Sequence, residues 1–296
     1  TFSPKGSKTV SQQTLELIQE NLELFLIDTE VETRNEFISL FRQFLYRLKD
    51  SGYALNRDAQ KLLAKDKFIE EAKGKLQIVE TYKRFLMWLT SRLKGLLLPG
   101  SQYQRVTSAL QILKQLIESN LDPNIPFKVS INNAFQIPIL NDTELIRLLF
   151  NNVLSTYDDI RDTASYLLIL AKPQLTAEEK SSLINKSFEL LNDYGKSDSG
   201  AKFLQLCHSL FKDDAIFTRL LAEIPLSLDI VEAVKNPVDG YFQAMSLIIP
   251  QINQKENLQP SRIVETVEKN WDAVKDILSH DSPEGCDQYG VGSAQL

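Results

Sequence analysis

The stretch that decides the fold is NDTELIRLLFNNVLSTYDDIRDTASYLLILA, residues 141–171. Apolar residues recur in it every three or four positions, which is the spacing of one face of an α-helix. The pattern predicts one helix over residues 141–154 and a second over residues 158–171. Because only a few residues separate them, the two helices are expected to pack against each other as a pair.

Helical spacing also covers most of the remaining chain. Only 11 glycines and 11 prolines occur among 296 residues, of which 43% are hydrophobic, and this composition favours helices over a turn-rich β fold. No segment has the alternation of a strand. Further helices are predicted from Gln12, across Phe37 to Leu48, from Phe68 to Leu93, over 101–118, 176–193, 200–212, 215–222, 228–235, 241–251 and 261–279. The chain is therefore predicted to be all-α.

An irregular bundle and an α-solenoid both fit this series of helices, and the length favours an α-solenoid of HEAT/armadillo-like helix pairs. Residues 1–120 are predicted to form helical repeats with a basic stretch, and 121–140, which contain three prolines, a connection. Residues 141–280 are predicted to form HEAT-like repeats, followed by a loop and tail over 281–296. Because the sequence begins with Thr1, it is expected to be part of a longer protein.

Three local patterns refine the helix prediction. Asp158-Asp159-Ile160-Arg161, followed by Ala164 and Leu168, is similar to the second helix of a HEAT repeat, where such side chains pair between neighbouring repeats. Ser101 with Gln104 and Thr176 with Glu179 have the form of capping boxes. Gly74 marks a possible kink or boundary in the helix that begins near Phe68.

Charge is unevenly distributed along the chain. The net charge is −6, but residues 34–114 hold 16 Lys and Arg against 7 Asp and Glu, a net of +9. Such a segment could form a basic face that binds RNA phosphates. The alternative is that these cations form ordinary solvated helix faces, some of them paired with neighbouring carboxylates. Both interpretations stay open at this point.

The patterns of common catalytic and metal sites are missing from the sequence. There is no strand followed by a glycine-rich loop for a nucleotide or methyl-donor cofactor. Cys207 and His208 are neighbours in a helical run, so they are expected to be a core cysteine and a partly exposed histidine rather than metal ligands. His280, Asp281 and Ser282 are neighbours in one loop, which is not the arrangement of a catalytic triad. We expect no enzyme activity, cofactor or metal.

The cellular compartment is predicted from apolar runs, the first residues and the use of cysteine. No apolar run approaches the roughly 20 residues that span a bilayer, and the first residues lack a signal-peptide core. Cys207 and Cys286 cannot form a disulfide framework, so a reducing compartment fits. The protein is expected to be cytoplasmic.

Several stretches resemble the THADA (thyroid adenoma-associated) family. The most specific is Leu98-Pro99-Gly100-Ser101-Gln102-Tyr103-Gln104-Arg105 followed by Ser108-Ala109-Leu110. The others, in the order that family shows, are Thr33-Arg34-Asn35-Glu36-Phe37, residues 158–161, Pro237-Val238-Asp239-Gly240-Tyr241-Phe242-Gln243-Ala244 and Asp281-Ser282-Pro283-Glu284-Gly285. The resemblance spans nearly the whole chain, but the Arg-Arg-Ser-Ala-Gly run associated with the family is missing.

The resemblance implies a piece of a long armadillo/HEAT-like protein. Fungal members of the family serve as the non-catalytic partner of a SAM-dependent tRNA ribose 2'-O-methyltransferase that acts on the anticodon loop. In that case the partner supplies the chemistry, and this chain holds tRNA and positions the loop. The candidate backbone contacts are Arg34, Lys83, Arg84, Arg92, Lys94 and Arg105. The alternative is a protein-binding adaptor, for example of a membrane-associated partner, that does not bind RNA.

Overall fold

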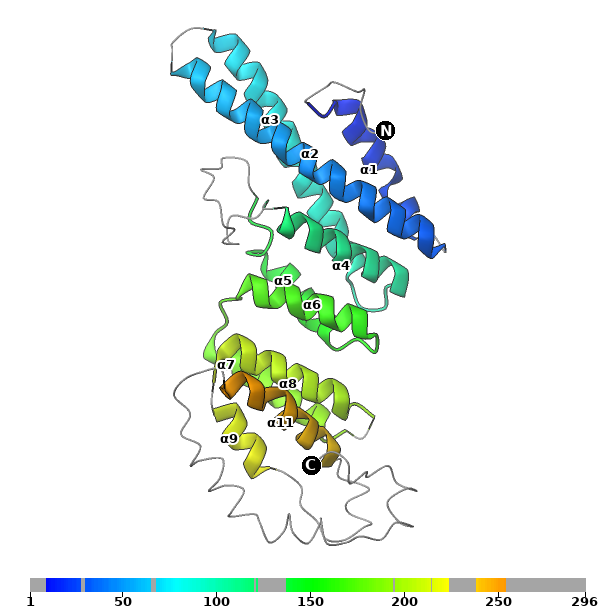
Figure 1. The fold of residues 1–296 in the computed structure, drawn as a ribbon, viewed down its shortest axis with the longest axis vertical. Helices are drawn as coiled ribbons and strands as arrows, with labels where there is room; N and C mark the ends of the chain where they lie inside the picture. Colours follow the sequence, from blue (N-terminus) through cyan, green and yellow to red (C-terminus); the bar gives the residue numbers. More distant parts are fainter. Residues whose placement is uncertain are drawn as a thin grey trace. The chain divides into compact units, whose positions relative to one another are not determined.

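A computed structural model describes residues 9–27, 30–64, 68–119, 121, 137–193, 195–213, 215–223 and 238–253 (Figure 1). Within these ranges every regular element is an α-helix, which confirms the all-α prediction. The helices are α1 (Gln12–Leu26), α2 (Val31–Leu63), α3 (Ile69–Leu96), α4 (Tyr103–Glu118), α5 (Thr143–Val153), α6 (Asp158–Ala171), α7 (Ala177–Leu191), α8 (Ser197–Phe211), α9 (Ala215–Ala222) and α11 (Val238–Asn253). The predicted helices at 228–235 and 261–279 lie outside the described residues.

The chain divides into two compact units, residues 1–173 and 174–296. Each is described here by itself. The predicted connection at 121–140 stays a prediction, because residues 122–136 lie outside the described ranges, as does the predicted tail at 281–296.

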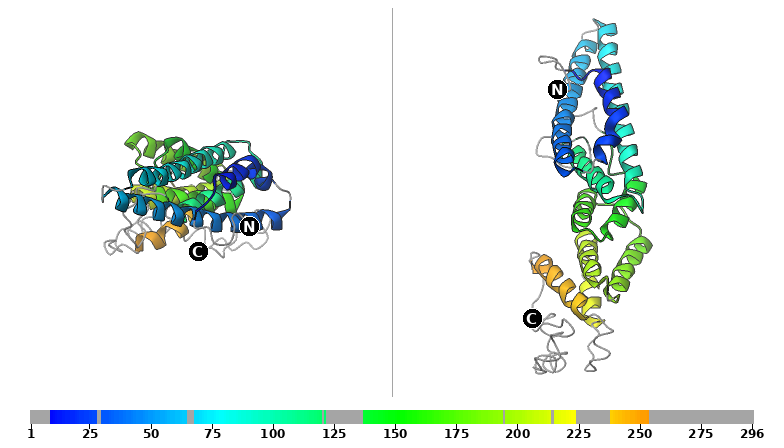
Figure 2. Two further views of the ribbon diagram at one scale, coloured as in Figure 1. Left: turned by 90° about the horizontal axis from the view of Figure 1, so that it is seen from above. Right: turned by 90° about the vertical axis from the view of Figure 1, so that its right-hand side faces the viewer.

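The α2/α3 pair forms the largest apolar seam of the first unit. The two helices are antiparallel, since Phe44 meets Phe85 edge-on at 5.7 Å while Ser51, further along α2, lies 3.4 Å from the hydroxyl of Tyr82. Phe37, Phe41, Phe44, Tyr82 and Phe85 are all buried, so they form part of the core, and within each helix they follow the spacing of one apolar face. Figure 2 shows α1 lying along this pair.

The buried Tyr82 hydroxyl also holds the segment that precedes α1. It donates a hydrogen bond to the carbonyl of Val10 and accepts one from the Val10 amide, both at 2.8 Å. Both main-chain groups of a buried residue are thereby satisfied by one side chain from α3.

Helices α2, α4 and α6 form the second layer of this unit. Gln115 on α4 donates to the main-chain carbonyl of Ile38 on α2, at 3.1 Å. The hydroxyl of Tyr103, at the start of α4, donates to Asp159 Oδ2 at 2.7 Å, at the start of α6. Further along, Lys114 lies 5.0 Å above the ring of Tyr166, so α4 and α6 run in the same direction.

The HEAT-like signature at the start of α6 makes contacts both within its own turn and with α4. Arg161 is buried and pairs with Asp158 in the same helical turn, and it donates to the carbonyl of Ser155 at 2.8 Å. Within the same signature, Asp159 makes a contact between helices by accepting from Tyr103 of α4. The prediction that these side chains join neighbouring repeats is supported for Asp159 and stays a prediction for Asp158 and Arg161.

Lys94 connects the end of α3 to the start of α5. Its Nζ donates to Asp142 at 2.6 Å and to Glu144 at 2.9 Å, and its side chain is only 18% exposed. Asp142 is the N-cap of α5 and accepts from the amide of Leu145 at 3.0 Å. Burial raises the pKa of Asp142, but the hydrogen bonds from Lys94 and Leu145 outweigh it, so the pKa lies below its ordinary value of 3.8.

Leu121 and Ile137, the described residues on either side of 122–136, lie next to each other. The amide of Ile137 donates to the carbonyl of Leu121 at 2.9 Å, and both side chains are buried. These two residues are therefore fixed next to each other within the first unit.

In the second unit, glycines allow helices α7, α8 and α11 to approach closely. A Cβ at Gly200 of α8 would lie 2.6 Å from the main-chain nitrogen of Leu191, and one at Gly240 of α11 would lie 2.7 Å from Ser197. Tyr241 is buried and donates to Asn192 at 3.1 Å, while Gln243 donates to Asp198 at 2.5 Å. Gly240, Tyr241 and Gln243, which belong to a stretch that carries part of the family resemblance, thus pack α11 against its neighbours.

Helix ends and the Gly74 position test the remaining local predictions. The capping box of Thr176 and Glu179 is confirmed. The one predicted for Ser101 and Gln104 was wrong: α4 has Gln102 as its N-cap without a side-chain bond, and Ser101 instead closes a turn by donating its amide to the carbonyl of Leu98. Helix α3 continues through Gly74 without a boundary.

We expect Gly200→Ala to lower the free energy of unfolding by about 1 to 3 kcal/mol, because the added methyl group would overlap main-chain atoms of α7. Gly74→Ala is the matched control, since a Cβ there meets nothing within 4 Å. That substitution should raise stability by about 0.5 to 1 kcal/mol, because glycine is a poor helix former. Urea denaturation followed by circular dichroism measures both changes; equal effects of the two variants would contradict the close packing of α7 and α8.

The Lys94–Asp142 contact predicts a specific response to acid. Because the folded-state pKa of Asp142 lies below 3.8, its contribution to stability is present above that pH and is lost as the pH falls through the folded-state value. Asp142→Asn keeps an N-cap but removes the charge, so it should abolish the part of the acid-dependent loss of stability that comes from Asp142. Asp142→Ala should lower the free energy of unfolding by about 1 to 2 kcal/mol at neutral pH through loss of the cap. Urea denaturation from neutral pH to pH of about 3 provides the measurement. An unchanged acid profile for Asp142→Asn would contradict the assignment.

Candidate nucleic-acid interface

Among the described residues, no group of three or more His, Cys, Asp and Glu side chains could hold a metal ion. In the same ranges, no helix has the length and apolar character needed to cross a membrane. The loop residues 280–282, considered above as a triad, lie outside the described part of the chain.

Cys207 and His208 lie in the core of the second unit. Burial raises the pKa of the Cys207 thiol to about 12, so it stays protonated at neutral pH. His208 was expected to be partly exposed, but it is buried, and its Nδ1 lies 2.9 Å from Gln251 Oε1. The prediction failed because α11 covers this face of α8, which the local pattern does not reveal.

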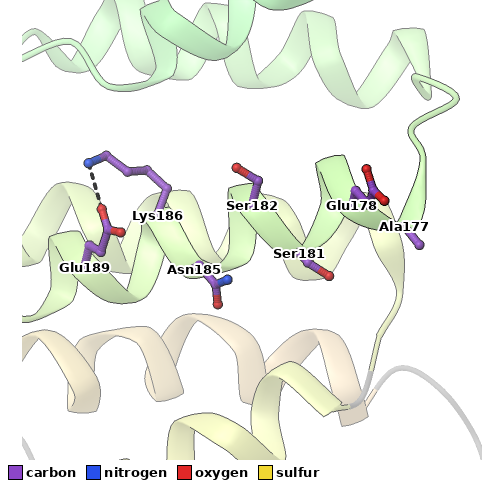
Figure 3. A pocket seen from close by; sticks show the side chains of 7 residues that line it. All are labelled: Ala177, Glu178, Ser181, Ser182, Asn185, Lys186 and Glu189. Atoms are coloured by element: carbon purple, nitrogen blue, oxygen red, sulfur yellow. Dashed lines mark hydrogen bonds and ion pairs between the residues drawn. The ribbon is translucent and has the colours of Figure 1, made fainter.

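An open surface recess of about 620 Å³ lies along the exposed face of α7 (Figure 3). Its lining comes from that helix alone: Ala177, Glu178, Ser181, Ser182, Asn185, Lys186 and Glu189. Lys186 pairs with Glu189 at 2.9 Å, and both side chains are more than half exposed. Such a row of solvated side chains is typical of a helix surface and does not resemble a catalytic pocket.

Part of the basic stretch is neutralised within its own helices. On α3, Lys73 pairs with Glu70 at 2.8 Å and Lys75 pairs with Glu71 at 2.6 Å. On α2, Arg57 lies 3.6 Å from Asp58. For these cations the interpretation as ordinary solvated helix faces holds, because a local carboxylate already balances each charge.

Two of the six candidate RNA contacts are paired with carboxylates far away in the sequence. Arg92 pairs with Glu23 of α1. Lys94 is held by Asp142 and Glu144, and these hydrogen bonds raise its pKa. Both side chains connect helices, and a phosphate would have to compete with these carboxylates for them.

Lys83 and Arg84 form the least neutralised part of the candidate set. They are neighbours on α3, where Arg84 is exposed and Lys83 half-buried. Arg84 donates to the hydroxyl of Thr81 at 3.3 Å, and no carboxylate pairs with either residue in the ranges that the structure describes. Two adjacent positive charges without acidic partners are suited to contact a phosphate backbone.

Arg34 and Arg105 are both half-buried and lie on the α2/α4/α6 layer. The Arg34 guanidinium is close enough to Tyr103 to act on its pKa electrostatically. Arg34 lies near the start of α2, whereas Lys83 and Arg84 are next to the part of α3 that packs against Phe44 and Ser51, so Arg34 is separated from them along the helix pair. The six candidates therefore do not form a single cluster.

The exposed Arg42 on α2 was not among the predicted contacts. It lies 5.8 Å above the ring of Tyr46, and Lys49 lies 4.8 Å from the same ring. The sequence could have indicated Arg42 as a further candidate contact. None of the residues three or four positions away is acidic, so no carboxylate of the same helix face is placed to neutralise it.

Comparison with known proteins places the chain in a family. The family described as "Trm732, TPR repeats" matches residues 1–162. TPR, HEAT and armadillo repeats are all built from stacked helices, so this agrees with the fold described above. No solved structure gives a significant match.

Two curated relatives are much longer than this chain. The "tRNA (32-2'-O)-methyltransferase regulator trm732" of Schizosaccharomyces pombe is 25% identical over 99% of this chain and 21% of its own length. The "tRNA (32-2'-O)-methyltransferase regulator THADA" of Gallus gallus is 23% identical over 65% of this chain and 10% of its own length. The chain therefore spans about a fifth or less of these relatives.

The resemblance to the THADA family is thereby confirmed. The family match covers more than half of the chain and takes in α1 to α5 and the first residues of α6. The chain belongs to the Trm732 family of TPR-repeat proteins.

Proposed function

We propose that the chain is part of a non-catalytic subunit that binds tRNA together with a SAM-dependent tRNA ribose 2'-O-methyltransferase and assists methylation in the anticodon loop. The observation that carries this proposal is the similarity, over 99% of the chain, to a protein named as a regulator of the tRNA (32-2'-O)-methyltransferase. The methyltransferase would supply the methyl-donor site.

Such a subunit acts by positioning its substrate. Holding a reactive group in the correct geometry removes much of the entropic cost of the reaction, so a subunit without catalytic residues can still increase the rate. A stack of helix pairs suits this task, because its side chains have fixed positions over a long surface.

We propose Lys83 and Arg84 as the principal backbone contacts in the first unit. They lie side by side on α3 and have no carboxylate partner in the described part of the chain. Arg34 and Arg105 are secondary candidates on α2 and α4. Arg92 and Lys94 rank last, because Glu23, Asp142 and Glu144 neutralise them. The basic stretch within residues 1–120 would in this case face RNA.

The double variant Lys83→Ala/Arg84→Ala in the full-length protein should weaken tRNA binding. Each lost phosphate contact lowers the slope of log affinity against log salt by about 1, so the slope should fall by up to about 2. Filter binding or fluorescence anisotropy over a series of salt concentrations measures both quantities. The loss should be uniform across tRNA sequences, since backbone contacts carry no sequence information.

The matched control is Lys73→Ala/Lys75→Ala on the same helix. It removes the same charge, but these lysines are already paired with Glu70 and Glu71, so tRNA affinity and salt slope should change little. Equal effects of the two double variants would refute specific phosphate contacts. If the full-length protein captures the methyltransferase but binds no tRNA at any salt concentration, it is an adaptor that does not bind RNA.

A further inference from the structure

Two tyrosines meet at the shared edge of α4 and α6. Tyr103 is the first residue of α4, and Tyr157 is the N-cap residue of α6. Their ring centroids are 4.5 Å apart, with the ring planes inclined by 48°. Tyr157 is 52% exposed, which is high for an aromatic side chain of a folded protein.

Tyr103 is held firmly in place. Its hydroxyl donates to Asp159 Oδ2 at 2.7 Å, and the hydroxyl of Thr107 lies 3.5 Å from the same oxygen. The hydrogen bond to Asp159 is the main reason why the pKa of Tyr103 is raised. Tyr103 therefore forms a fixed support, and the ring of Tyr157 rests against it.

The exposed ring of Tyr157 is not part of the hydrophobic core. The contact between α4 and α6 is already made by Tyr103 with Asp159 and by Lys114 with Tyr166. The aromatic core of the first unit lies instead between α2 and α3. An aromatic ring supported on one side and open on the other is suited to binding a flat partner.

The carboxylates nearest the tyrosine pair make contacts within the fold. Asp158 forms an ion pair with Arg161. Asp159 accepts the hydrogen bond from Tyr103 and keeps its negative charge, so any attraction for a base at this point comes from the ring face of Tyr157 and not from charge.

We propose that Tyr157, supported by Tyr103, stacks on an unpaired base of RNA. This inference rests on the proposed function. A tRNA anticodon loop offers unpaired bases, and proteins commonly hold such bases by stacking them on aromatic rings. A continuous duplex offers no free base face, so the surface should distinguish loops from stems.

The test uses the full-length protein and two RNA probes: an anticodon stem-loop and a blunt duplex of the same stem. Tyr157→Ala should weaken stem-loop binding by at least about 5-fold and leave duplex binding unchanged. Tyr157→Phe and Tyr157→Trp should retain wild-type affinity, because each keeps an aromatic face. The slope of affinity against salt should not change, since stacking releases no counterions.

Tyr166→Ala is the matched control. Tyr166 is also an exposed tyrosine of α6, but its ring already lies under Lys114, so both probes should bind as they do to the wild type. Circular dichroism confirms that each variant is folded.

Three outcomes would overturn the inference. The first is unchanged stem-loop binding by Tyr157→Ala, and the second is an equal loss for both probes. The third is loss of methyltransferase capture by Tyr157→Ala with RNA binding intact, which would make the pair a protein interface. If the wild type binds neither probe nor tRNA, the proposed function fails as well. If the Lys83/Arg84 variant behaves as expected and Tyr157→Ala does not, only the stacking inference fails.

Discussion

The constraint on which this structure depends is that each amphipathic helix has an apolar face that only its neighbours can cover. The α2/α3 seam shows how this is met, because Phe44 and Phe85 belong to helices that are antiparallel and in register along their length. Once that register is set, polar groups at fixed positions connect the next helices. Asp159 then meets Tyr103, and Asp142 meets Lys94. The polar contacts thus follow from the packing and refine it.

The sequence predicts the helices well because their signals are local. The apolar spacing places the helix 158–171 at the bounds that α6 has in the structure. The capping box at Thr176 and Glu179 also forms, since both residues lie in one helical turn. The box predicted at Ser101 did not form, because a preceding turn uses the Ser101 amide and shifts the helix start by two residues.

The candidate site was harder to predict, because its outcome depends on contacts between distant residues. Local counting shows an excess of positive charge, but it does not show that Glu23 neutralises Arg92 or that Asp142 and Glu144 neutralise Lys94. The partners are separated by 69, 48 and 50 residues, respectively. The burial of His208 was not predicted for the same reason. The helix that covers it is α11, and its contact residue Gln251 is 43 positions away in the sequence. Which cations of a basic stretch are available to RNA phosphates therefore depends on the fold as well as on the composition.

The main-chain hydrogen bond between Ile137 and Leu121 joins the residue just after α4 to the residues that lead into α5. Both side chains are buried, so the two residues belong to the core of the first unit. The end of α4 and the approach to α5 are therefore held together by main-chain atoms, which a side-chain substitution does not remove unless it introduces proline at residue 137. The spacing of these two helices should for that reason tolerate any apolar side chain of similar size at either residue.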